Sequence, residues 1–139
     1  MSARSKARKR ALDALFASDL TGEDALEALS RTEKESRERE SQTAIFDYAE
    51  TLVAGYLANS DRIDSRLQGL AEGWSLDRMP NVDRAILRIA AWELLYNSEI
   101  PSEVAIAEAV SLASELSTDE SPKFINGILA RLAKDRQGL

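Results

Sequence analysis

The chain has 139 residues, 44% of them hydrophobic and 30% charged, so it can bury a core and has the balance of a globular protein. It contains no cysteine and no histidine, which excludes disulfides and any metal site built from thiolate or imidazole ligands. No window approaches the roughly 20 consecutive apolar residues of a membrane helix, and the N-terminus lacks the apolar segment of a secretory signal. These features fit a reducing cytoplasm and no membrane.

Positive charge is concentrated at the N-terminus. Residues 1–10 contain five bases and no acid, and the whole chain carries −6, so residues 11–139 carry −11. The five bases are Arg4, Lys6, Arg8, Lys9 and Arg10. Cations at a helix N-terminus oppose the macrodipole, so helix electrostatics do not explain them. We interpret residues 1–10 as a basic arm that contacts a polyanion, and the alternative is a solvated start to a helix.

Hydrophobic residues recur at helical spacing along nearly the whole chain. The spacing predicts an amphipathic helix over residues 4–19, and we expect its first turn or two to project beyond the packed body. Residues 23–30 predict a short second helix, whereas the wholly polar residues 31–40 indicate a solvated connection or a polar helix extension. A long helix stripe follows over 45–57, and residues 59–61 indicate a break and a new cap.

The second half of the chain continues the helical pattern. Gly73 and Pro80 mark a boundary, after which residues 81–97 are apolar on nearly all sides, as is typical of a helix in the middle of a bundle. Pro101 begins a further helix, and Thr118 or Ser121 caps the last one. No long stretch alternates at period two. We therefore predict a single all-α domain over residues 1–139, a compact bundle of about six or seven helices.

The last predicted helix has a second face beside its hydrophobic stripe. Phe124 lies roughly 90° from the stripe of Ile125 and Leu129, at about 100° per residue. Lys123 precedes it, and an aromatic ring beside cations suits single-stranded nucleic acid, because bases stack on the ring while cations meet phosphates. Gly127 is costly inside a helix and would allow close approach to the backbone. The simpler interpretation is that Phe124 completes the core and the bases suit the helix C-terminus.

Several segments together carry a resemblance to a known family. They are ARKRALDALF at 7–16, VDRAILRIAAWEL at 82–94, PSEVAIAEAVSLA at 101–113 and DESPKFINGIL at 119–129. In this order and combination they resemble the NusB family of transcription antitermination factors over essentially the whole chain, with residues 21–60 least distinctive. The chain departs from the family pattern at Ala107, where Asn is often found, and at Trp92, where Tyr is common.

The resemblance implies a NusB-like RNA-binding domain of two packed helical subdomains that has no cofactor and is not an enzyme. It implies a transcription antitermination factor that binds boxA-type single-stranded RNA in nascent transcripts together with the ribosomal protein NusE. Such a factor promotes elongation of ribosomal RNA operons, with the RNA polymerase elongation complex as an indirect partner. Two alternatives are a helical adaptor that binds only proteins and a homodimer in which the RNA site is masked.

The resemblance also implies roles for particular residues. The Arg-rich start of the family contacts RNA, as do the aromatic residue late in the first helix and the Lys-Phe pair of the final motif. With the rest of the basic run, the candidates for RNA binding are Arg4, Lys6, Arg8, Lys9, Arg10, Phe16, Lys123 and Phe124. The acidic position at the start of the central helix, associated with the NusE surface, maps onto Asp83, which is followed by Arg84. Asn126 is a further candidate for reading a base.

An enzyme is not expected from these residues. Without His or Cys, catalysis would need a carboxylate, Lys, Tyr or Ser site, and Ser114 and Ser117 have no neighbouring base in the sequence. A di-metal helical bundle uses a Glu-x-x-His motif, which this chain cannot supply, so no metal is expected. NusB-like domains are also attached to certain RNA methyltransferases, but we expect no catalytic domain here because the sequence ends at Leu139.

Overall fold

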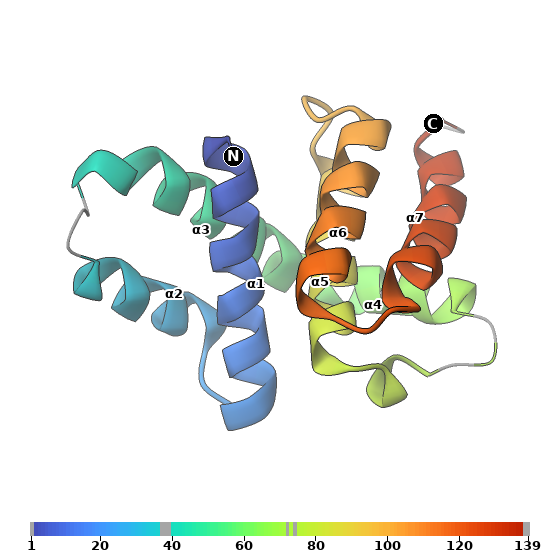
Figure 1. Cartoon of the computed structure of the whole chain (residues 1–139), viewed down its shortest axis with the longest axis horizontal. Helices are drawn as coiled ribbons and strands as arrows, with labels where there is room; N and C mark the ends of the chain where they lie inside the picture. The colour runs from blue at the N-terminus through green and yellow to red at the C-terminus, as the bar shows by residue number, and fades with distance from the viewer. Residues whose placement is uncertain (1, 37–39, 72, 74, 138–139) are drawn as a thin grey trace. The chain divides into compact units, whose positions relative to one another are not determined.

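The computed structural model describes residues 2–36, 40–71, 73 and 75–137, and within these ranges it contains seven α-helices, two short 3-10 helices and no strand (Figure 1). The helices form two compact units, Met1–Ala58 and Asn59–Leu139. The predicted all-α class, with about six or seven helices in two helical parts, is confirmed. In the described part of the chain, no helix is long and apolar enough to cross a membrane.

The first unit contains α1 (Ala3–Thr21), α2 (Ala25–Glu35), η1 (Glu40–Gln42) and α3 (Thr43–Ala58). Each of its three α-helices packs against the other two. Their facing sides carry small and branched apolar residues, whose removal from water drives this packing. The core of the unit includes Ala7, Ala11, Leu12, Leu15, Ala28, Leu29, Phe46, Ala49, Leu52 and Val53.

The N-terminal bases belong to a packed helix. Ser2 caps α1, which is helical from Ala3 onward. Ala7 and Ala11 are 0% exposed, because these small side chains extend the apolar stripe of α1 to its first turns. Arg8 is only 3% exposed. The first turn, as far as Lys6, is largely exposed, but the expected projection is wrong from Ala7 onward, where α1 already contacts the core.

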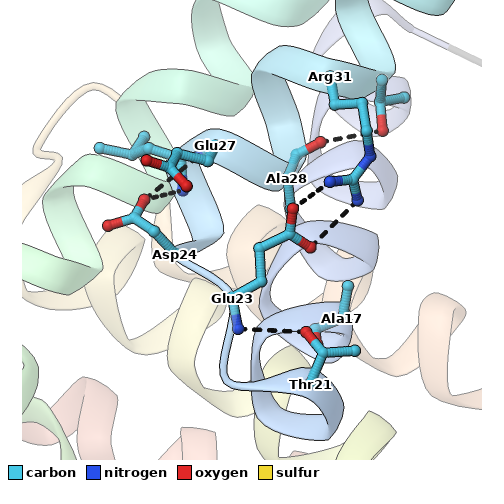
Figure 2. A network of polar contacts seen from close by, with 9 residues as sticks. Ala17, Thr21, Glu23, Asp24, Glu27, Ala28 and Arg31 are labelled. Carbon is cyan, nitrogen blue, oxygen red and sulfur yellow. Dashed lines mark hydrogen bonds and ion pairs between the residues drawn. The ribbon is translucent and has the colours of Figure 1, made fainter.

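Polar contacts hold the turn between α1 and α2 (Figure 2). Gly22 follows α1 with a φ of 78°, a left-handed conformation that glycine adopts without strain. Asp24 caps α2, and its carboxylate accepts the N–H of Leu26 at 2.8 Å. Glu23 forms a two-point ion pair with Arg31 of α2. The hydrogen bond from Arg31 holds the pKa of the Glu23 carboxyl below its ordinary value.

The polar segment 31–40 is helical as far as Glu35. Lys34 lies in the last turn of α2, where a cation interacts favourably with the carbonyl groups at the helix end. Ser36 then ends the helix. The interpretation as a helix extension therefore holds for residues 31–35, whereas residues 37–39 lie outside the described part of the chain.

The second unit contains α4 (Ser60–Leu70), η2 (Leu76–Arg78), α5 (Asn81–Tyr96), α6 (Ser102–Leu116) and α7 (Ser121–Gln137). α5 packs against α4, α6 and α7, which confirms the prediction of a central helix. Ile125, Ile128 and Leu129 of α7 are each 0% exposed, so its hydrophobic stripe faces inward as predicted.

The helix boundaries follow local signals in the sequence. α3 ends at Ala58 and α4 begins at Ser60, as predicted, although Asn59 at the cap position makes no side-chain capping bond. Pro80 and Pro101 precede α5 and α6, where their restricted backbone ends the incoming segment. Ser121 is the first residue inside α7 rather than its cap.

Candidate nucleic-acid interface

Two of the N-terminal arginines converge on one aromatic ring. The guanidinium carbons of Arg4 and Arg8 lie 5.4 Å and 6.0 Å from the centroid of the Tyr48 ring in α3. A cation within about 6 Å of a ring centroid is attracted by the ring's quadrupole, so Tyr48 orients both side chains. Arg4 is exposed and can reach a ligand, whereas Arg8 is 3% exposed and offers little surface. Arg8 therefore contributes mainly to the packing of α1 on α3.

The remaining three bases of the N-terminal run line one pocket. Lys6, Lys9 and Arg10 surround a hollow of about 280 Å³, and its other walls are formed by Asp13 of α1, Gln42 of η1 and Ile45 of α3. We call this the α1 pocket. The guanidinium carbon of Arg10 lies 5.5 Å from the centroid of the buried Phe46 ring, so this cation has a defined position. Three cations around one hollow make it attractive to an anionic ligand.

Among the described residues that line the α1 pocket, Asp13 is the one acid. Its side chain is exposed as a whole, but nearby protein atoms partly desolvate the carboxyl, and this raises the pKa of Asp13. The positive charges of Arg10 and Lys9 lower that pKa by a smaller amount. The carboxyl is therefore partly withdrawn from water. Sequence reasoning missed Asp13, although its spacing of three and four residues from Arg10 and Lys9 places it on their face of α1.

In the second unit, Phe124 lines a surface hollow of about 330 Å³. The ring is half-buried and Lys123 beside it is exposed, whereas the stripe residue Ile125 is 0% exposed. Phe124 therefore lies outside the fully buried core, in the direction that the helical spacing predicts. The other residues around the hollow are Arg78, Met79, Pro80, Asp83, Thr118, Glu120 and Ser121. Of these, Arg78 is an exposed base on the segment that the sequence indicated only as a boundary.

Asp83 is a buried hydrogen-bond acceptor at the start of α5. It is 3% exposed, and its carboxylate accepts hydrogen bonds from the hydroxyls of Ser117 and Ser121, the latter at 2.8 Å. The two serine hydroxyls lie 3.0 Å apart, and the hydroxyl of Thr118 lies 2.7 Å from that of Ser121. This network ties the first turn of α5 to the segment that leads into α7, and so positions the start of the helix that carries Phe124.

Arg84 holds the segment that precedes α5. Its Nη1 donates to the backbone oxygen of Leu76 at 2.8 Å, and its Nη2 donates to the side-chain oxygen of Asn81. Asp83 and Arg84 therefore both make hydrogen bonds within the chain. Their implied role in binding a partner stays a prediction.

Known proteins match both the sequence and the fold of this chain. A model of the NusB family matches residues 5–134. The chain belongs to the NusB family. The transcription antitermination protein NusB of a Nocardioides species is 53% identical over 139 residues, which are 100% of this chain and 99% of that protein. The same name is carried by a Paenarthrobacter aurescens protein that is 49% identical over 139 residues, 100% of this chain and 98% of that protein.

Solved NusB structures share the fold of the whole chain. A structure of T. maritima NusB matches with a TM-score of 0.83 and 33% identity, covering 98% of this chain and 97% of that chain. A chain in a crystal structure of the antitermination factors NusB and NusE in complex with dsRNA matches with a TM-score of 0.81 and 28% identity. It covers 97% of this chain and 98% of that chain. The resemblance to the NusB family is therefore confirmed.

Phe16 is half-buried late in α1 and is not among the residues around the α1 pocket. Asn126 is exposed on α7. A Cβ added at Gly127 would meet nothing within 4 Å among the described residues, so packing within the chain does not require a glycine there.

Proposed function

We propose that this protein is a transcription antitermination factor that binds boxA-type single-stranded RNA in nascent transcripts together with NusE, and so promotes elongation of ribosomal RNA operons. The observation that carries the proposal is the α1 pocket, where Lys6, Lys9 and Arg10 gather in a chain whose residues 11–139 carry −11. Membership of the NusB family supports the antitermination role. The related complex of NusB and NusE with dsRNA supports RNA and NusE as partners, and the single-stranded boxA target follows from the family resemblance.

The charge distribution suits a directed contact with RNA. Phosphate contacts supply affinity and position, and the exposed Arg4 and Lys123 add to the cations of the α1 pocket. Sequence preference then comes from stacking and from hydrogen bonds to base edges, for which the half-buried ring of Phe124 is suited. The acidic remainder of the chain limits binding of arbitrary RNA. It also favours rapid encounter with a basic ribosomal protein.

The protein acts in this proposal by binding and assembly, not by catalysis. The RNA is bound and not chemically changed. The bound RNA and NusE then act on the RNA polymerase elongation complex, so this protein affects the polymerase indirectly. We infer a cytoplasmic location, because nascent bacterial transcripts are made in the cytoplasm.

Binding measurements test the proposal. A short boxA-like RNA, a scrambled RNA of the same length and a duplex of the boxA-like RNA are titrated with the full chain, with and without NusE, and followed by fluorescence anisotropy. We expect the boxA-like single strand to bind best and NusE to strengthen that preference. Equal binding of all three RNAs in both states, with the NusE complex intact, would contradict RNA recognition and leave an adaptor that binds only proteins.

A further inference from the structure

The α1 pocket contains an acid that phosphate binding does not explain. A phosphate placed beside Asp13 would be repelled, so a pocket built only for phosphate would do better without this carboxylate. The walls also include a neutral amide, Gln42, and a half-buried aliphatic side chain, Ile45. Cations, an acid, an amide and an apolar surface together suit a planar ligand with a polar edge and a charged tail. One nucleotide of an RNA strand has these properties.

The polar groups of the pocket come from elements that pack on each other. Asp13, Lys9 and Arg10 lie on one face of α1, and Gln42 and Ile45 come from η1 and the start of α3, which packs against α1. The hydroxyl of Ser36 donates to Oε1 of Gln42 at 3.2 Å. Because that bond uses the amide oxygen, the amide NH2 is the group that Gln42 can offer to a ligand as a donor.

We propose that the α1 pocket takes one unpaired guanine of a bound RNA, with the Asp13 carboxylate accepting hydrogen bonds from guanine N1–H and the N2 amino group. The cations of the pocket then contact the neighbouring phosphates. This inference rests on the proposed function, because it assumes that the protein binds RNA. It adds the base that the pocket reads and the residue that reads it.

Guanine fits the carboxylate better than the other three bases. Its Watson–Crick edge presents two adjacent donors, which match the two oxygens of a carboxylate. Cytosine and adenine each present a single amino group on that edge, and uracil presents one N–H between two oxygens that a carboxylate repels. Guanine O6, next to N1, is an acceptor for the amide NH2 of Gln42 or for Lys6. Ile45 supplies an apolar surface for the face of the ring.

The size and the polarity of the pocket agree with this occupant. Its volume of about 280 Å³ lies just below the roughly 300–1,000 Å³ of pockets for drug-sized ligands, so it suits one base and not a base pair. Burial raises the pKa of Asp13, which means that the carboxyl is partly shielded from water.

Single-base substitution in the RNA tests the inference. The full chain is titrated with U-rich single-stranded oligonucleotides that carry guanine, inosine or adenine at one position, and anisotropy gives the dissociation constants. Inosine lacks only the N2 amino group, so we expect it to bind about tenfold more weakly than guanine. Equal affinity for guanine and inosine would overturn the proposal.

Two variants and a control locate the reading group. Asp13→Asn should reduce the preference for guanine over inosine to below about twofold. It should also strengthen binding of the adenine oligonucleotide, because it removes a negative charge that repels RNA. Gln42→Ala should weaken guanine and inosine equally, since both bases keep O6. Asp47→Asn makes the same change of charge at an exposed position on α3 and should leave the guanine preference unchanged. A preference for guanine that survives in Asp13→Asn would overturn the assignment.

The two proposals fail in different ways. Selective binding of the boxA-like RNA without any preference for guanine over inosine would overturn the guanine pocket and leave the proposed function standing. Failure of the wild-type chain to bind any of these RNAs, with or without NusE, would overturn both.

Discussion

The buried acid at the start of α5 gives the sharpest stability prediction. Asp83 is 3% exposed and accepts two hydroxyl hydrogen bonds, from Ser117 and Ser121. A hydrogen bond to a charged group contributes about 1.5–3 kcal/mol. Part of this is offset, because a buried carboxylate carries a desolvation cost and the two serines can still bond to each other. We therefore expect Asp83→Ala to lower the free energy of unfolding by about 3 kcal/mol.

The assay is unfolding in urea and by heat, followed by circular dichroism at 222 nm. For a chain of 139 residues, about 3 kcal/mol corresponds to a melting temperature lower by roughly 10 °C. Asp77→Ala removes an exposed acid of the same unit and should change stability by less than about 0.5 kcal/mol. Ser121→Ala should cost less than Asp83→Ala, and the double variant should cost less than the sum, because both changes remove the same bond.

Two results would refute this reasoning. One is a loss below about 1 kcal/mol for Asp83→Ala, and the other is strict additivity of Asp83→Ala and Ser121→Ala. The network also decides how a partner-binding test at Asp83 must be interpreted. Asp83→Lys would replace a buried negative charge with a positive one and could unfold the protein. Weaker NusE binding by this variant therefore supports a contact only if the variant is folded at the temperature of the assay.

Three further predictions concern other parts of the molecule. Gly127→Ala and the control Gly69→Ala in α4 should each stabilise the free protein by about 1 kcal/mol, because each added Cβ meets open space. Only Gly127→Ala should weaken RNA binding, and equal RNA binding by the two variants would contradict a close approach of RNA to the α7 backbone. Phe124→Ala should lower RNA affinity in the NusE complex by about 1–3 kcal/mol. It should destabilise the fold less than Phe46→Ala, which removes a 1% exposed ring, and an equal loss of stability in urea unfolding would make Phe124 a core residue. Asp13→Asn should raise the melting temperature at neutral pH, because the raised pKa of Asp13 means that folding disfavours its charged form. The gain should vanish below the ordinary pKa of 3.8, where the carboxyl is protonated in both the folded and the unfolded state. A gain in melting temperature that persists at that pH would contradict this cause.

Local signals in the sequence were sufficient for the helices. Helical spacing and the two prolines at Pro80 and Pro101 located α5 and α6, since a proline restricts the backbone wherever it occurs. Helical spacing places Arg8 near the apolar stripe of α1, four residues before Leu12, but does not by itself predict that a charged side chain is buried there. Its burial depends on α3, because Tyr48 receives the guanidinium and the alanine face of α1 lies against that helix.

The sites depend on pairs of residues that are distant in the sequence. Asp83 meets Ser117 and Ser121 at separations of 34 and 38 residues, and no local pattern connects them. Asp13 shares a helix face with Lys9 and Arg10, a signal that spacing could have provided. The opposite wall of the α1 pocket, at Gln42, is set by the packing of α1 on α3 and has no signal in the sequence.

The salt dependence of RNA binding tests most directly whether the cations of the α1 pocket contact RNA phosphates. Dissociation constants for the boxA-like RNA are measured at several salt concentrations for the wild type, the triple variant Lys6→Ala/Lys9→Ala/Arg10→Ala and the control Lys34→Ala, an exposed base on α2. At about 0.7 per phosphate for a single strand, three lost contacts should make the slope of log affinity against log salt shallower by about 2, with no change in the control. Identical slopes for the wild type and the triple variant, with the fold intact by circular dichroism, would contradict RNA binding at this pocket.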